Sequence, residues 1–139
     1  MRSENRPFGL LAEFYDELLA EVKGMNAHAR RAILGDSIDR VKSVCDLACG
    51  SGDTALEFAR AGKRVFAVDN SPVFCKRVRA LARREKLPVT VLCADMRSFR
   101  LPEPVDFLTC EFSALNNLTH RRDLPRVLGW PRGWRKPCN

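Results

Sequence analysis

The chain has 139 residues, of which 45% are apolar and 29% are charged. This composition is sufficient for one globular domain and excludes disordered, collagenous and coiled-coil classes. The net charge of +7 is compatible with nucleic-acid binding. The basic residues gather on an amphipathic helical segment and at the carboxyl terminus, so a solvated surface is the simpler interpretation.

The sequence carries no apolar run long enough to cross a bilayer, and no secretory signal at its start. We therefore expect a cytoplasmic protein without a membrane partner, in which all six cysteines are reduced thiols. No two cysteines form a C-x-x-C pair, and the two histidines are far apart, so no metal site is expected.

The first forty residues predict two helices. Apolar residues recur at helical spacing over 9–20, and Gly24 is expected to end that helix. A second amphipathic helix is expected over 26–39, with an interruption at Gly35.

From residue 41 the pattern changes to alternating strands and helices. Glycine-rich residues 49–52 follow the first apolar run, Gly62 ends the next helix, and Ser71-Pro72 begins another. The expected elements, in chain order, are strand 44–48, helix 53–61, strand 65–68, helix 72–87, strand 89–93, strand 105–112 and a short helix 121–128. This order predicts an α/β fold with a parallel sheet and right-handed crossovers.

Chemically useful groups stand at the ends of these strands. Acidic residues occur at or near three ends, as Asp69, Asp95 and Glu111, and the glycine turn follows a fourth strand. In such sheets ligands bind beyond the carboxyl ends of the strands. Gly50 and Gly52 allow close approach of the backbone, and Asp69 can accept hydrogen bonds from both hydroxyls of a ribose. Together these features predict a pocket for an adenosine-containing ligand.

Four segments, in order and at suitable spacing, resemble the motifs of class I S-adenosylmethionine-dependent methyltransferases. They are 46–52 (Asp-Leu-Ala-Cys-Gly-Ser-Gly), 65–71 (Val-Phe-Ala-Val-Asp-Asn-Ser), 94–99 (Ala-Asp-Met-Arg-Ser-Phe) and 106–112 (Asp-Phe-Leu-Thr-Cys-Glu-Phe). Tyr15-Asp16 is similar to the tyrosine-containing lid of some small-molecule methyltransferases. The resemblance implies a Rossmann-like sheet preceded by two helices, S-adenosylmethionine as cofactor, and methyl transfer to an acceptor that is more plausibly a small molecule than nucleic acid or protein.

The resemblance also implies individual roles. Asp46 would orient the turn and reach the methionine ammonium, Asp69 would hold the ribose, and Asp95 with Met96 would bind adenine. The implied cofactor-binding set is Tyr15, Asp46, Ala48, Cys49, Gly50, Ser51, Gly52, Asp69, Asn70, Asp95, Met96, Cys110 and Glu111. Ala48 departs from the family, which often has glycine there. The segment 112–118 would border the acceptor, and no general base is evident.

The family sheet normally has seven strands, and only about four can be placed here. We expect three regions: an N-terminal helical lid over 1–40, a cofactor-binding half domain over 41–128 and a basic tail over 129–139. A shifted reading frame over the tail can encode an amphipathic helix, so a frameshift is one hypothesis and a genuine basic tail the other. Without its next neighbour, strand 105–112 would expose an edge through which the chain could self-associate.

Other interpretations stay open. The glycine turn and Asp69 also suit a nicotinamide- or flavin-dependent oxidoreductase, although Asp46 and the Asp95-Met96 pair have no role there. A truncated, inactive methyltransferase is the third possibility. Individually, Asp69 and Asp95 could simply form turns, Tyr15 could belong to the core, and the cysteines could be packing residues.

Overall fold

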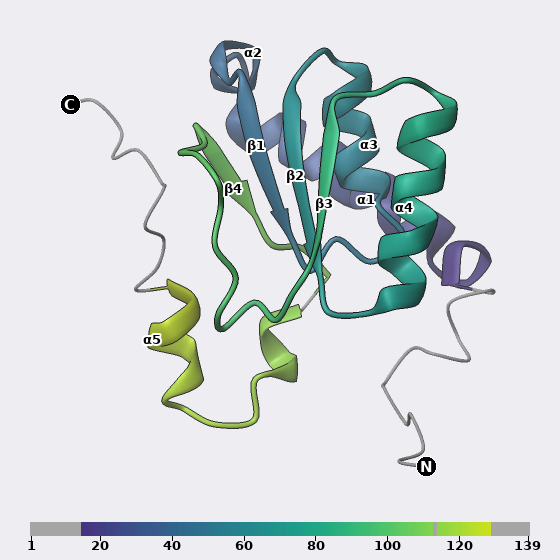
Figure 1. Cartoon of the computed structure of the whole chain (residues 1–139). Coiled ribbons are helices and arrows are strands. Elements are labelled where there is room, and N and C mark those ends of the chain that lie inside the picture. Colours follow the sequence, from purple (N-terminus) through teal and green to yellow (C-terminus); the bar gives the residue numbers. More distant parts are fainter. Residues whose placement is uncertain (1–14, 113, 129–139) are drawn as a thin grey trace.

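The computed structural model describes residues 15–112 and 114–128, which form a four-stranded parallel sheet with helices on its flanks (Figure 1). The strand order is β3-β2-β1-β4, so the chain begins in the interior of the sheet and reverses direction once. This confirms the predicted α/β class. The elements are α1 Tyr15–Leu34, α2 Ser37–Arg40, β1 Ser43–Leu47, α3 Asp53–Arg60, β2 Arg64–Asp69, α4 Pro72–Arg84, β3 Val89–Cys93, β4 Phe107–Thr109, the 3-10 helix η1 Ala114–Asn117 and α5 Asp123–Leu128.

The N-terminal helices differ from the expectation at Gly24. That glycine does not end a helix, because α1 runs through it to Leu34. A glycine in a helix interior costs about 1 kcal/mol relative to alanine, which side chains anchored elsewhere along the helix can offset. Gly35, with φ +49°, does separate α1 from α2 as predicted.

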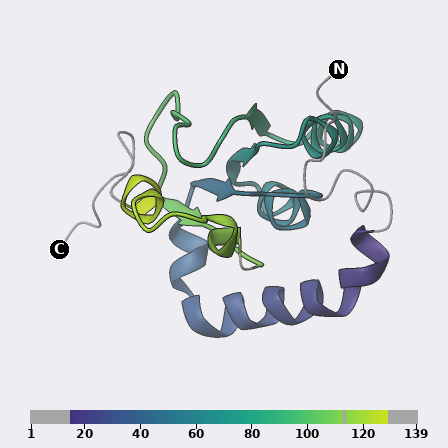
Figure 2. The same ribbon diagram turned by 90° about the horizontal axis from the view of Figure 1, so that it is seen from below.

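The sheet is covered differently on its two faces. Along β2, Val65 and Ala67 pack toward α3 and α4, whereas Phe66 and Val68 pack toward the segment after β3 and toward α5. Figure 2 shows α1, α3 and α4 on one side of the sheet, and α5 with the segment between β3 and β4 on the other. Both faces are therefore buried, which explains why the strands are continuous apolar runs.

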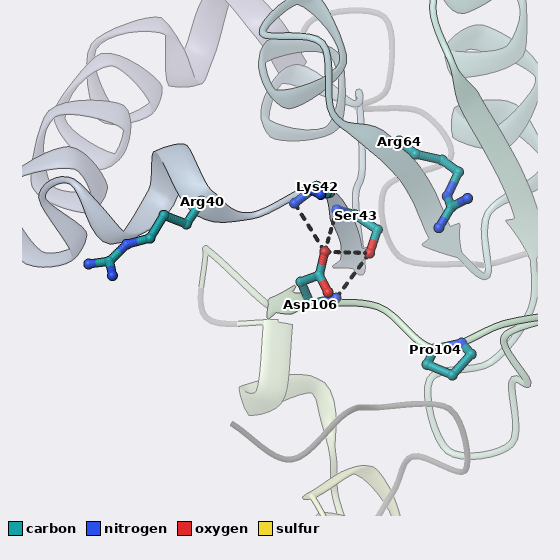
Figure 3. Close-up of a pocket in the computed structure, with 6 residues that line it drawn as sticks. All are labelled: Arg40, Lys42, Ser43, Arg64, Pro104 and Asp106. Carbon is teal, nitrogen blue, oxygen red and sulfur yellow. Dashed lines mark hydrogen bonds between the residues drawn. The ribbon is translucent and has the colours of Figure 1, made fainter. Parts of the chain in front are cut away.

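A hydrogen-bonded clasp joins β1 and β4 at their amino ends (Figure 3). The Asp106 carboxylate accepts bonds of 3.0 Å from the backbone N–H groups of Lys42 and Ser43 and from the Ser43 hydroxyl. Arg40 and Arg64 border the same shallow pocket of about 370 Å³. This clasp sets the register of β4 at the opposite end of the sheet from the acidic residues discussed below.

The strand predicted over 105–112 is shorter than expected. Only Phe107–Thr109 pairs with β1, and within the described residues β4 has no neighbour on its other side. Phe112 adopts φ +57°, which is incompatible with extended strand geometry, so the chain turns away into η1. No helix in the described portion combines the length and the apolar character needed to cross a membrane.

Candidate functional site

A cavity of about 860 Å³ opens beyond the carboxyl ends of the strands. Each of the four strands contributes to its wall through the residues that follow it. Ala48 and Gly50 come from the turn after β1, Asp69 from the end of β2, Asp95 from the segment after β3 and Glu111 from that after β4. The parallel topology therefore gathers the acidic residues and the glycine turn in one place, as the sequence predicted.

Asp69 is fixed by the backbone on both of its carboxylate oxygens. Oδ2 accepts a 2.9 Å bond from the Gly50 N–H, and Oδ1 accepts a 2.8 Å bond from the Ser71 N–H. A carboxylate offers about four acceptor positions, so each oxygen keeps one for a ligand. Asp69 is thus oriented before binding and can still accept two hydroxyl donors.

The turn after β1 requires left-handed backbone at every second residue from 48 to 52. Ala48 has φ +58° and Gly50 has φ +52°, and Gly52, with φ +88°, precedes the first residue of α3. Glycine adopts this region freely, whereas a residue with a Cβ is strained there. Alanine at 48 is therefore strained at a position where the resembling family often has glycine.

Replacing Ala48 with glycine is expected to stabilise the fold by about 0.5 to 1 kcal/mol, because relief of the left-handed strain exceeds the added chain entropy. Urea unfolding measures this difference. The control is Ala29→Gly in the exposed face of α1, where the same substitution should destabilise by about 1 kcal/mol. Equal signs for the two variants would contradict the strain at residue 48.

Asp95 is paired with a neighbouring arginine. The Arg97 side chain donates 2.9 Å and 2.6 Å bonds to its two carboxylate oxygens, and the Arg97 backbone N–H adds a 2.8 Å bond. These bonds hold the pKa of Asp95 below its usual range. Arg97 also contacts the buried Asp123 of α5 at 3.3 Å. The amino group of a nucleobase bound here would share the Asp95 carboxylate with Arg97.

Asp46 lies beneath the turn and is only 2% exposed. Burial, and then the nearby charge of Glu111, raise its pKa to about 8, although the Ala55 N–H donates to its carboxyl group. Its Oδ2 atom has no hydrogen-bond partner within the described residues. A neutral carboxylic acid at this position retains one unsatisfied polar atom.

The pKa of Asp46 predicts a pH-dependent stability. The folded state keeps a proton that the unfolded state loses near pH 4, so the free energy of unfolding should fall as the pH rises from about 4 to about 8. Loss of the Asp46 proton from the unfolded chain should lower the free energy of unfolding by on the order of 1 kcal/mol per pH unit over this range. Asp46→Asn, which mimics the neutral acid, should remove this dependence. Denaturant midpoints of both proteins between pH 5 and 8 test this, and parallel pH profiles would contradict it.

Residues 44–133 match the family model described as a methyltransferase domain. The match includes more than half of the chain. The protein belongs to this methyltransferase-domain family.

Solved structures agree with the fold of the methyltransferase domain. An S-adenosylmethionine-dependent methyltransferase from Clostridium acetobutylicum superposes with a TM-score of 0.67 and 21% identity, covering 88% of this chain and 50% of that one. Coclaurine N-methyltransferase, solved with N-methylheliamine and SAH, superposes with a TM-score of 0.52 and 31% identity, covering 66% and 26%. Among curated proteins, Hemagglutinin 1 of Eikenella corrodens is 41% identical over 63 residues. The chain spans half of the Clostridium structure and 21% of the Eikenella protein.

The structure brings together many, but not all, of the residues predicted from sequence. Those lining the cavity of the methyltransferase domain are Ala48, Gly50, Asp69, Asn70, Asp95, Met96 and Glu111. Tyr15 begins α1, but its side chain lies outside the described part of the chain, as do residues 1–14 and the tail over 129–139.

The other predicted residues, Asp46, Cys49, Ser51, Gly52 and Cys110, do not line this cavity. Ser51 accepts a 2.9 Å bond from Lys23 of α1, and Gly52 packs against Val78 of α4. Cys49 and Cys110 are partly buried, and burial raises the pKa of Cys110 to about 11 and that of Cys49 above its usual range. Both cysteines are therefore protonated thiols at neutral pH, which makes them poor nucleophiles.

Several lining residues were not predicted as cofactor contacts. They are Val68, Ser71, Pro72, Phe74, Cys93, Ala94, Phe112, Ala114, Asn116, Asn117 and Thr119. Cys93 ends β3 and Ala94 directly follows it, so the rule that led to Asp69 would have included both. Ser71 lies two residues beyond the end of β2. The segment expected to border the acceptor does reach the cavity, through Phe112, Asn116 and Asn117.

Proposed function

We propose that this domain binds S-adenosylmethionine in the cavity beyond the strands and transfers its methyl group to a small molecule. The observation that carries the proposal is the row of acidic residues across the sheet. Asp95 follows β3, Asp69 ends β2 and Glu111 follows β4, with the glycine turn after β1 between the last two. This order matches a linear ligand with a base, a ribose and a cationic side chain.

The residues fit such a cofactor chemically. The free acceptor positions of Asp69 suit the two ribose hydroxyls, and Met96 beside Asp95 offers an apolar surface for a base. The unsatisfied Oδ2 of buried Asp46 would be completed by an ammonium group or a bridging water. The cavity volume lies within the range of small-ligand sites.

The chemistry divides between the ligand and the chain. When bound, the sulfonium supplies the methyl group and a neutral thioether leaving group. The chain's own residues bind, orient and exclude water, which is what an in-line displacement needs most. On the acceptor side, Phe112 offers an apolar wall, and Asn116 and Asn117 offer hydrogen-bond donors and acceptors. The similarity to coclaurine N-methyltransferase, solved with N-methylheliamine, supports a small-molecule acceptor.

Thermal unfolding with two ligands tests the proposal against a dinucleotide-binding oxidoreductase. S-adenosylhomocysteine at about 100 times its dissociation constant should stabilise the fold by about 2.7 kcal/mol and raise the melting temperature by roughly 10 °C. NADH at the same concentration should leave it unchanged. A shift with NADH alone would overturn the proposal in favour of the oxidoreductase.

A further inference from the structure

The Glu111 carboxylate is held by side chains from three different elements. Arg30 of α1 forms an ion pair with Oε1, which also accepts a 3.0 Å bond from the Thr109 hydroxyl at the end of β4. Oε2 accepts a 3.3 Å bond from the Thr54 hydroxyl in the first turn of α3. Contacts on both oxygens fix the orientation of a carboxylate that borders the cavity.

Arg30 is itself immobilised. Its side chain is 8% exposed, it forms a second ion pair with Glu57 of α3, and its guanidinium lies 5.2 Å from the centre of the Phe58 ring. Glu57 is half-exposed and does not border the cavity, so the two glutamates share one arginine but only Glu111 faces a ligand. The salt bridge therefore fixes the position of the Glu111 carboxylate at the cavity wall.

A second carboxyl group, that of Asp46, lies within electrostatic range of Glu111. Burial and the charge of Glu111 keep Asp46 protonated at neutral pH, as described above. Glu111 forms its ion pair with Arg30. Glu57 and Glu111 share the single positive charge of Arg30, so the three side chains together keep one net negative charge, and Glu111 is the member at the cavity wall.

The strand order locates this charge relative to a bound cofactor. With the base at β3 and the ribose at β2, the substituent on the ribose 5′ carbon extends toward β1 and β4. The sulfur is bonded directly to that carbon. Glu111, after β4, is therefore on the side of the cavity that the sulfur and the methionine chain must occupy.

We propose that Glu111, held by Arg30, Thr54 and Thr109, makes the site select the cationic sulfonium over the neutral thioether product. The inference rests on the proposed function. An opposite charge at close range changes the relative free energy of a charged group by the equivalent of one to three pKa units. A discrimination of about tenfold or more is therefore expected.

Two unreactive ligands isolate this effect. Sinefungin carries an ammonium group at the position of the sulfonium, whereas S-adenosylhomocysteine has a neutral sulfur, and both carry the same amino-acid ammonium. Calorimetric affinities give their ratio, in which contributions from the shared groups cancel. The ratio of the sinefungin affinity to the S-adenosylhomocysteine affinity should be about tenfold or more higher in the wild-type chain than in Glu111→Gln.

Glu57→Gln is the matched control, because it removes the other partner of Arg30 without changing the cavity wall. Its affinity ratio should equal that of the wild type. An unchanged ratio in Glu111→Gln, or an equal loss in Glu57→Gln, would overturn the inference.

A measurement on the wild type covers the case in which Glu111→Gln does not fold. The wild-type chain itself should favour sinefungin over S-adenosylhomocysteine, and equal affinities would overturn the inference. If S-adenosylhomocysteine binds but the ratio does not depend on Glu111, the proposed function stands and the inference fails. If neither ligand binds the folded wild type, both fail.

Discussion

Gly52→Ala is expected to destabilise the fold by about 3 kcal/mol. An added Cβ would lie 2.6 Å from Cγ2 and 3.1 Å from Cγ1 of Val78, which is fully buried and has little rotamer freedom in α4. Overpacking of this kind costs about 1 to 3 kcal/mol, and the φ of +88° adds about 1 to 2 kcal/mol for a residue with a Cβ. Denaturant unfolding measures the sum.

Gly62 provides the control for the cost of left-handed backbone without overpacking. It has φ +80°, and a Cβ there would meet nothing within 4 Å. Gly62→Ala should therefore lose only about 1 to 2 kcal/mol. In a double-mutant cycle, Val78→Ala should recover part of the loss at residue 52 and none at residue 62. Equal losses in the two glycine variants would show that Val78 does not limit the approach of the helices.

Asp69→Asn is expected to weaken the binding of S-adenosylhomocysteine about 100-fold. The substitution removes the charge and one of the two acceptor oxygens that the ribose hydroxyls would share, and hydrogen bonds to charged groups contribute about 1.5 to 3 kcal/mol each. It also places an amide N–H against the N–H of Gly50 or Ser71. Titration calorimetry gives the affinity of each protein.

Asp36→Asn is the matched control for Asp69→Asn. Asp36 is exposed and makes no side-chain bond to the start of α2. The change in charge is the same, but the affinity should not change. If Asp69→Asn bound as tightly as Asp36→Asn, Asp69 would have no part in binding, and the ribose would need another partner.

Sequence reasoning succeeded where local signals agree. β3 occupies the predicted 89–93, because the apolar run directly follows Pro88. The preceding helix is predicted to reach residue 87 but ends at Arg84, and Lys86 beyond it has φ +54°. Sequence reasoning failed at Gly24, where propensity alone suggests a break. Lys23 contacts Ser51 at 2.9 Å and Asp53 at 2.6 Å, and Arg30 contacts Glu57 and Glu111, so anchors on both sides of Gly24 keep α1 continuous. Such contacts depend on how the helix docks, which spacing does not reveal.

Within the site, too, contacts that depend on how the elements pack cannot be read from sequence spacing. The acidic residues converge because parallel strands end at the same edge, and that follows from the order of elements. Asp46 belongs to the same motif as Gly50, but side chains alternate along β1, which places it on the face shared with Val44 and beneath α3. The pairing of Arg30 with Glu111, 81 residues apart, appears only in the folded chain.

Calorimetric titration of the unmodified 139-residue chain with S-adenosylhomocysteine tests the central claim most directly. We expect saturable binding at one site per chain, a result that would show the four strands to be sufficient to form the cofactor cavity. Absence of binding by a folded, monomeric chain would contradict it.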